Sequence, residues 1–244
     1  MTTQFTQHAQ RRHTVAGRHT SGPGTNQSMT RPPRTRKPPT HRRPKRGTSM
    51  LQGRDLPGRL SKDMLLDSGV LHAVNEHYAY LTAFSDSLYG RANILSDVMP
   101  QTAIACMTTA AWVWCGGVFP TSFDVVSTSH FRKFMMNRPV RTYARHIEPG
   151  HIQRIGELQL TSPPRTACDL ALLPAHMLFE DGWDAIVHKL MGDYGVTVDE
   201  CAALLAERRF PPQAKQARQA YQFFGLPVPE YLLEADEEPE PLLP

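Results

Sequence analysis

The sequence has few cysteines, and they are not arranged as metal or disulfide sites usually are. Its four cysteines, Cys106, Cys115, Cys168 and Cys201, lie far apart, form no CxxC pair, and mostly sit in apolar surroundings typical of a core. This spacing argues against a structural zinc site and against a disulfide framework. We therefore expect a reduced, cytoplasmic protein.

Phosphate-binding loops and long apolar runs are also missing. No GxGxxG or Walker pattern occurs, and the Gly116-Gly117 pair is typical of a helix end. The most apolar run, residues 103–119, is broken by two threonines and this glycine pair, and it is short for a membrane span. The N-terminus lacks the apolar segment of a signal peptide. We expect no cofactor and no membrane association.

The first 54 residues contain no Asp or Glu, although they hold 12 of the 27 Lys and Arg of the chain. Such a segment has little to bury and cannot recover the entropy cost of ordering, so residues 1–58 are expected to be disordered. Residues 229–244 carry six acidic side chains and no basic one, which predicts a loose acidic tail. The near-neutral body between the two is the part expected to fold.

The densest basic tract, residues 31–46, is a candidate contact for nucleic acid. Basic side chains in such a tract neutralise phosphates without reading sequence, and the binding falls steeply with salt. No aromatic residue interleaves the charges to stack on bases, so the expected contact is with DNA and is nonspecific. The alternatives to a nucleic-acid contact are that the tract is a solubilising tail or that the start codon is placed too far upstream. The residues expected to contact phosphates are Arg31, Arg34, Arg36, Lys37, Arg42, Arg43, Lys45 and Arg46.

The best-defined local feature is the run LQLTSPPRTACDLALL, residues 158–173. Leu158 and Leu160 alternate with polar neighbours as in a strand, Ser162 is a natural helix N-cap, and Pro163 fits the first helical turn. The run therefore predicts a strand that turns sharply into a helix. We take its structural motif to be Ser162, Pro163, Arg165, Thr166 and Asp169.

The charged pair in this motif has two interpretations. Arg165 and Asp169 are four residues apart, so on a helix their side chains meet. One interpretation is an ordinary ion pair worth a few tenths of a kcal/mol. The other is a charged site for a partner or a phosphate. We expect the structural role.

The remaining chain predicts an α+β fold. A short helix capped by Ser61 and a hairpin over residues 70–81 resemble the second half of a winged helix-turn-helix. A helix over residues 83–99 follows, and then strands over 103–106, 123–129, 140–147 and 157–161 that we expect to form a small, mainly antiparallel sheet. The last helices are expected over 177–191, from Thr197 in a capping box with Glu200, and over 212–224.

Two details of these elements bear on function. The helix in the DNA-reading position offers Lys62 against Asp63 and Asp67, so we expect it to have a packing role and not to read DNA sequence. Trp112 and Trp114 cannot face the same way on one helix, so we expect one in the core and the other against a neighbouring lobe or partner.

No set of residues specifies catalysis. Asp181, Asp184 and His188 have a helical spacing that could present ligands to a divalent metal, but no second ligand helix is evident, and a solvated polar face explains them as well. Ser162 has no histidine placed by sequence to activate it. The sequence therefore predicts a protein that is not an enzyme.

The order of elements is similar to that of the AbiEi-type antitoxins of bacterial type IV toxin-antitoxin systems. The resemblance covers roughly residues 60–226 and rests on LLDSGVLHAVNEHYAYL, TTAAWVWCGG and TSPPRTACDLA, the last matching the family pattern TSPxRTLxDLA. The chain departs from the family at Cys106-Met107, where the family has Ser-His, and in the early winged-helix portion, which the basic tract replaces.

The resemblance implies a non-enzymatic transcriptional regulator with a winged helix, here a partial one over residues 59–100, that binds its own promoter. It also implies that residues 101–228 form an antitoxin domain that counters a nucleotidyltransferase toxin. Some relatives continue into a restriction-endonuclease-like domain, and this chain stops at that junction. An accessory or remnant protein of a nuclease-associated family is therefore the alternative function.

Overall fold

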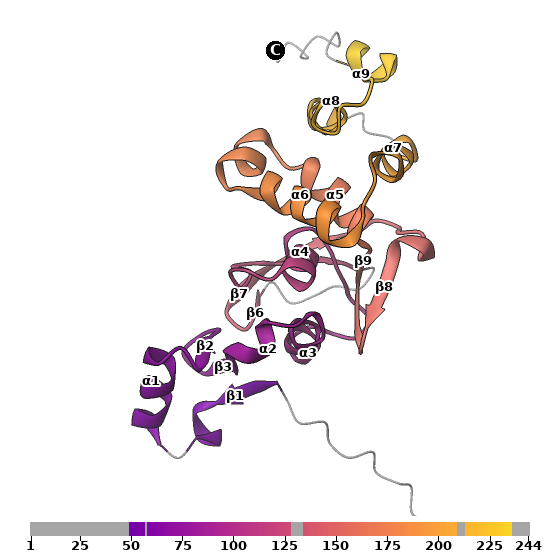
Figure 1. Cartoon of the computed structure of the whole chain (residues 1–244). Coiled ribbons are helices and arrows are strands. Elements are labelled where there is room, and N and C mark those ends of the chain that lie inside the picture. The colour runs from indigo at the N-terminus through magenta and orange to yellow at the C-terminus, as the bar shows by residue number, and fades with distance from the viewer. Residues whose placement is uncertain (1–48, 57, 128–133, 209–212, 236–244) are drawn as a thin grey trace, which may run out of the picture. The chain divides into compact units, whose positions relative to one another are not determined.

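The computed structural model describes residues 49–56, 58–127, 134–208 and 213–235. The basic tract at residues 31–46 and most of the acidic tail lie outside these ranges, so the structure does not test what the sequence predicts for them. The described residues form two sheets and a set of helices (Figure 1). The α+β class expected from the sequence is confirmed.

The first sheet has three strands in the order β1-β3-β2. The predicted hairpin is confirmed as β2 (Leu71–Ala73) and β3 (Tyr78–Leu81), which pair antiparallel. Strand β1 (Met50–Gln52) pairs with the other edge of β3, and Met50 is buried opposite Tyr80. Structure therefore starts before the expected boundary at residue 58, because pairing with a distant strand is not visible in local composition.

The helices around this sheet differ in detail from the prediction. A 3-10 turn (Gly53–Asp55) precedes α1 (Arg59–Asp67), which begins after Gly58, so Ser61 lies inside the helix and does not cap it. The expected helix over 83–99 is two helices, α2 (Thr82–Ser85) and α3 (Leu88–Val98). The break occurs because the Ser87 hydroxyl accepts a hydrogen bond from Gly90 N–H and starts a new helix.

The second sheet has six strands in the order β6-β7-β5-β4-β9-β8. The sheet is mainly antiparallel, as predicted, because β4 with β5, β6 with β7 and β8 with β9 pair antiparallel; β4 with β9 and β5 with β7 pair parallel. Strand composition predicted the places of β4, β5, β7 and β9, but it missed β6 and β8 and did not indicate which strands pair. The strands are β4 (Ile104–Ala105), β5 (Phe123–Val126), β6 (Phe134–Met135), β7 (Arg138–Tyr143), β8 (Ile152–Ile155) and β9 (Leu158–Thr161).

The C-terminal helices follow β9 and pack mainly against α4 and against one another. Helix α7 has the predicted capping box between Thr197 and Glu200. The helix expected over 177–191 is instead a π-helical turn and α6, separated by Gly182 in the left-handed conformation (φ 76°). The segments are a 3-10 turn (Pro149–His151), α5 (Pro163–Ala171), the π turn (His176–Glu180), α6 (Trp183–Tyr194), α7 (Val198–Ala206), α8 (Ala214–Phe223) and α9 (Glu230–Glu234). Helix α9 lies in the expected acidic tail, and its Leu232 is buried.

Helix α4 (Met107–Cys115) is the centre of the core. It packs against α3, α5, α6 and strands β5 and β9, and Figure 1 shows it between the sheet and the α5–α6 pair. Because neighbours cover it all round, both Trp112 and Trp114 are buried, at 3% exposure each. As expected, the two rings face different elements: that of Trp112 lies 6.4 Å from Tyr80 on β3, and that of Trp114 lies 5.1 Å from Tyr194 on α6.

Candidate functional site

The bend from β9 into α5 is built as the sequence predicted, except for its cap. Ser162 occupies the N-cap position and Pro163 the first helical position, but the Ser162 hydroxyl makes no capping hydrogen bond. The hydroxyl of Thr166 instead lies 2.9 Å from the Ser162 carbonyl oxygen and 3.1 Å from that of Thr161. Thr161 and Thr166 are fully buried, so these bonds fix the bend from within.

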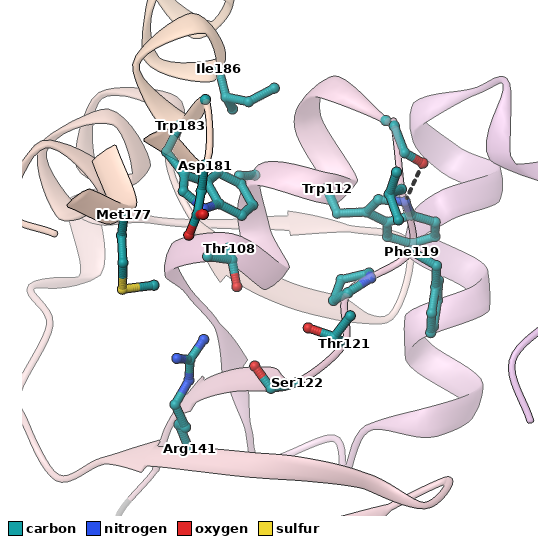
Figure 2. A pocket seen from close by; sticks show the side chains of 16 residues that line it. Thr108, Trp112, Phe119, Thr121, Ser122, Arg141, Met177, Asp181, Trp183 and Ile186 are labelled. Atoms are coloured by element: carbon teal, nitrogen blue, oxygen red, sulfur yellow. Dashed lines mark hydrogen bonds between the residues drawn. The ribbon is translucent and has the colours of Figure 1, made fainter. Parts of the chain in front are cut away.

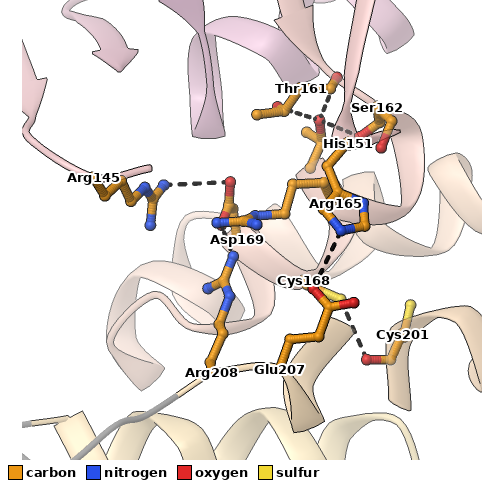
Figure 3. A network of polar contacts seen from close by, with 11 residues as sticks. Arg145, His151, Thr161, Ser162, Arg165, Cys168, Asp169, Cys201, Glu207 and Arg208 are labelled. Carbon is orange, nitrogen blue, oxygen red and sulfur yellow. Dashed lines mark hydrogen bonds and ion pairs between the residues drawn. The ribbon is translucent and has the colours of Figure 1, made fainter. Parts of the chain in front are cut away.

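The carboxylate of Asp169 is the charged centre of this bend. Its side chain is completely buried, and three guanidinium groups surround it (Figure 3). Arg165 Nε lies 3.3 Å from Oδ1, Arg208 Nη2 lies 2.5 Å from Oδ1, and Arg145 Nη2 lies 3.3 Å from Oδ2. The predicted pair of Arg165 and Asp169 is confirmed, but it is a buried network and not an exposed ion pair.

The balance of burial and charge keeps Asp169 ionised. Burial alone raises the pKa of this carboxyl group, but the positive charges of Arg208, Arg145 and Arg165 and the hydrogen bond from Arg208 outweigh it and lower the pKa. For Arg165, burial and the two neighbouring guanidinium groups lower the pKa despite the attraction of Asp169. The network therefore joins one negative charge to three positive ones.

The network ties together segments that are distant in the sequence. Arg145 follows β7, Arg165 and Asp169 lie on α5, and Arg208 follows α7. Neither Arg145 nor Arg208 was expected to contribute, because nothing in the local sequence around them marks a contact with Asp169. Their positions emerge only from the fold.

A second buried carboxylate, Asp124 on β5, has its own partners. Arg141, its neighbour on the parallel strand β7, donates from Nε to Oδ1 at 2.7 Å and from Nη2 to Oδ2 at 3.1 Å. Thr108 also donates to Oδ2, and the hydroxyl of Thr109 accepts from the Asp124 N–H at 2.7 Å. Asp124 therefore anchors the start of α4 to the sheet.

Arg141 also borders a cavity of about 490 Å³. Trp112, Phe119, Met177 and Trp183 give it apolar walls, and Figure 2 shows Arg141 on one side and Asp181 with Trp183 on the other. Its volume lies within the range of small-ligand pockets. The residues that line it include no histidine or cysteine.

The suggested metal ligands do not come together. Asp181 precedes the break at Gly182, whereas Asp184 and His188 lie on α6, and the His188 ring packs 5.3 Å from that of Phe223. Among the described residues, no three His, Cys, Asp or Glu side chains are placed to hold a metal ion. The acidic residues at this end of α6 are therefore a polar surface.

Comparisons with known proteins do not assign a family. No protein-family model matches the chain, and no curated protein matches it. The resemblance to AbiEi-type antitoxins therefore stays a prediction that rests on the motifs quoted above. Within the described part of the chain, no helix is both long enough and apolar enough to cross a bilayer.

Proposed function

We propose that this chain is a non-enzymatic, antitoxin-like regulator whose folded body binds a nucleotidyltransferase toxin. In this proposal, the basic residues from Arg31 to Arg46 add nonspecific affinity for DNA, and α1 with the β2–β3 hairpin is the remnant of a winged helix. The protein acts in the cytoplasm and needs no cofactor.

The proposal rests on one observation: the residues of the antitoxin-like motif at the start of α5 are buried and bonded within the protein. Arg165, Thr166 and Asp169 are at most 7% exposed, and each is bonded to the bend itself or to neighbouring segments. Residues that perform chemistry must reach a substrate, whereas these hold β9 and α5 at a fixed angle. A scaffold of this kind suits a protein that acts by binding.

The surface next to the aromatic cavity supports a protein partner. Val118 borders the cavity and is 86% exposed, and Phe179, in the π turn that also supplies Met177 to the cavity, is 52% exposed. Exposed apolar residues beside a pocket are typical of interfaces, where a partner inserts a large side chain as an anchor. We place the toxin contact at this cavity.

The neighbouring reading frame and co-expression with its product test the proposal: we expect that frame to encode a nucleotidyltransferase toxin, and its absence would weaken the antitoxin interpretation. The protein should restore growth to cells that produce the toxin and should co-purify with it. Val118→Asp should abolish both effects, because it places a charge in the apolar contact. Met64→Asp, a matched change at a residue of α1 that is 71% exposed, should leave both effects intact.

A failure of the wild-type chain to protect cells and to co-purify would overturn the proposal. Stable binding to a nuclease encoded nearby, without protection against the nucleotidyltransferase, would favour the alternative of a nuclease-associated accessory protein.

A further inference from the structure

The network around Asp169 has more positive charge than its carboxylate can balance. Among the described residues, Asp169 is the only carboxylate within ion-pair distance of Arg145, Arg165 and Arg208. Three guanidinium groups and one carboxylate leave two positive charges in a place where water is scarce. Such an excess attracts a further anion.

Several N–H groups of this network also lack an acceptor. Nε and Nη2 of Arg145 and Nε of Arg208 are buried and have no hydrogen-bond partner among the described residues. Arg145 Nη2 lies 3.3 Å from Asp169 Oδ2, which is itself buried without a hydrogen-bond partner, but the pair lacks hydrogen-bond geometry; the Cys106 thiol also interacts with the Arg145 side chain. Buried donors are almost always satisfied in folded proteins, so unfilled ones point to a missing acceptor.

Arg145 also lines an open cavity of about 520 Å³. Its side chain is 31% exposed, the largest value of the three arginines, so it is the one that a ligand can reach. Thr102, Ser127 and His146 add polar groups, and Ile104, Val126 and Ile147 add apolar walls. Figure 3 shows Arg145 reaching Asp169 from the opposite side to Arg165.

The position of the cavity in the sheet is one where ligands commonly bind. Strands β5 and β7 are parallel, and the cavity is lined by the residues at and just after their carboxyl ends, Val126 and Ser127 from one and Ala144 to Ile147 from the other. Ligands of sheets with parallel strands bind preferentially outside these ends.

We propose that this cavity binds the phosphate group of a ligand, with Arg145 as the direct contact and Arg165 and Arg208 as supporting positive charges. A guanidinium group attracts a phosphate and donates charge-assisted hydrogen bonds to it, and Arg145 is the arginine of the network that lines the cavity. The proposal is independent of the toxin partner: it requires only the network and the cavity.

Phosphate titration of the full chain tests the site. Inorganic phosphate and pyrophosphate are titrated by calorimetry at constant ionic strength, with chloride as the balancing anion. Arg145→Gln should weaken binding about tenfold or more, the loss of a charged contact of this kind. Arg154→Gln removes a guanidinium group that pairs with Glu157 at the surface and should leave binding unchanged. The other basic residues are the same in the wild type and in both variants, so their contribution to the phosphate affinity cancels in the comparison.

A second measurement needs no variant. Phenylglyoxal modifies accessible arginines, and mass spectrometry follows each one. Saturating phosphate should slow modification of Arg145 at least severalfold and leave Arg154 unaffected. Equal slowing of both, or equal binding by wild type and Arg145→Gln, would overturn the site.

The source of the phosphate is tested by comparing a mononucleotide with a short single-stranded oligonucleotide. If Arg145→Gln weakens binding of the mononucleotide, the site takes a free phosphate ligand. If it weakens binding of the oligonucleotide alone, the site takes the backbone of a nucleic acid. Insensitivity of both would overturn the site.

Discussion

The indole Nε1 of Trp114 donates a hydrogen bond of 2.9 Å to the carbonyl oxygen of Thr161. This bond joins the last turn of α4 to the last residue of β9, and both groups are buried. The main-chain carbonyl of Trp114 accepts hydrogen bonds from Arg91 at 3.0 Å and from Tyr194 at 2.5 Å. Trp114 therefore connects the centre of the core to the bend on which our account rests.

Replacing Trp114 tests this connection. Trp114→Phe keeps an aromatic ring but removes one of two donors to the Thr161 carbonyl oxygen, which still accepts from the Thr166 hydroxyl; the lost bond should lower the free energy of unfolding by about 0.5–1.5 kcal/mol in addition to the loss of ring contacts. Urea unfolding measures the change. Trp183→Phe, at a half-buried residue of α6, should have a smaller effect. Equal losses would show that the bond to Thr161 is unimportant.

The hydroxyl of Thr166 should matter more than that of Ser162. Thr166→Val preserves shape but removes the hydroxyl that bonds to the Ser162 and Thr161 carbonyl oxygens, so we expect a loss of about 1–3 kcal/mol. Ser162→Ala should lose less than about 0.5 kcal/mol, because the Ser162 hydroxyl makes no capping bond. If urea unfolding showed a larger loss of stability for Ser162→Ala than for Thr166→Val, the Ser162 hydroxyl would cap α5 in solution.

Gly90 is required by the close approach of α2 to α3. A Cβ atom at this position would overlap the carbonyl group of Phe84, so Gly90→Ala should destabilise the protein by more than about 2 kcal/mol. Gly192→Ala is the matched control, because Gly192 lies in α6 with open space around it. That change should stabilise the helix by up to about 1 kcal/mol. In thermal unfolding, the Tm should fall for Gly90→Ala and rise for Gly192→Ala.

The proposed DNA contact depends on the basic tract. Replacing Arg31, Arg34, Arg36, Lys37, Arg42, Arg43, Lys45 and Arg46 by Gln in the full chain should abolish most retardation of a DNA duplex at low salt. Strand β1, which begins at Met50, stays intact in this variant. For the wild type, the logarithm of the affinity should fall with that of the salt concentration, by about 0.9 per phosphate contacted. Undiminished retardation by the variant would place DNA binding on the folded body.

Local signals in the sequence predicted local structure well. The hairpin of β2 and β3, the bend at Ser162-Pro163 and the capping box of α7 each depend on residues within a few positions of one another. For the same reason the contact of Arg165 with Asp169 was predictable, since both lie on adjacent turns of α5.

Contacts between distant segments were not predictable. Arg208 and Arg145 reach Asp169 from other parts of the chain, and Asp124 meets Arg141 only because β5 and β7 are parallel neighbours. The sequence therefore indicated an ordinary helical ion pair where the fold places a buried network. The burial of both Trp112 and Trp114 likewise depends on the position of α4 between the sheet and the C-terminal helices.

The central claim is that Asp169 is a buried structural carboxylate, and its pH dependence tests this claim most directly. The pKa of Asp169 is lowered in the fold, so its ionised form contributes stability above its ordinary pKa of about 4, and that contribution is lost as the pH falls through the lower, folded-state value. Asp169→Asn removes the charge at every pH and leaves the arginines without their partner.

The measurement is urea unfolding of the wild type and Asp169→Asn from neutral to acidic pH. We predict that the variant is less stable by about 3–5 kcal/mol at pH 7, and that the difference shrinks below about pH 4 as the wild-type carboxylate is protonated. A difference below about 1 kcal/mol at pH 7, or one that does not change with pH, would contradict the account.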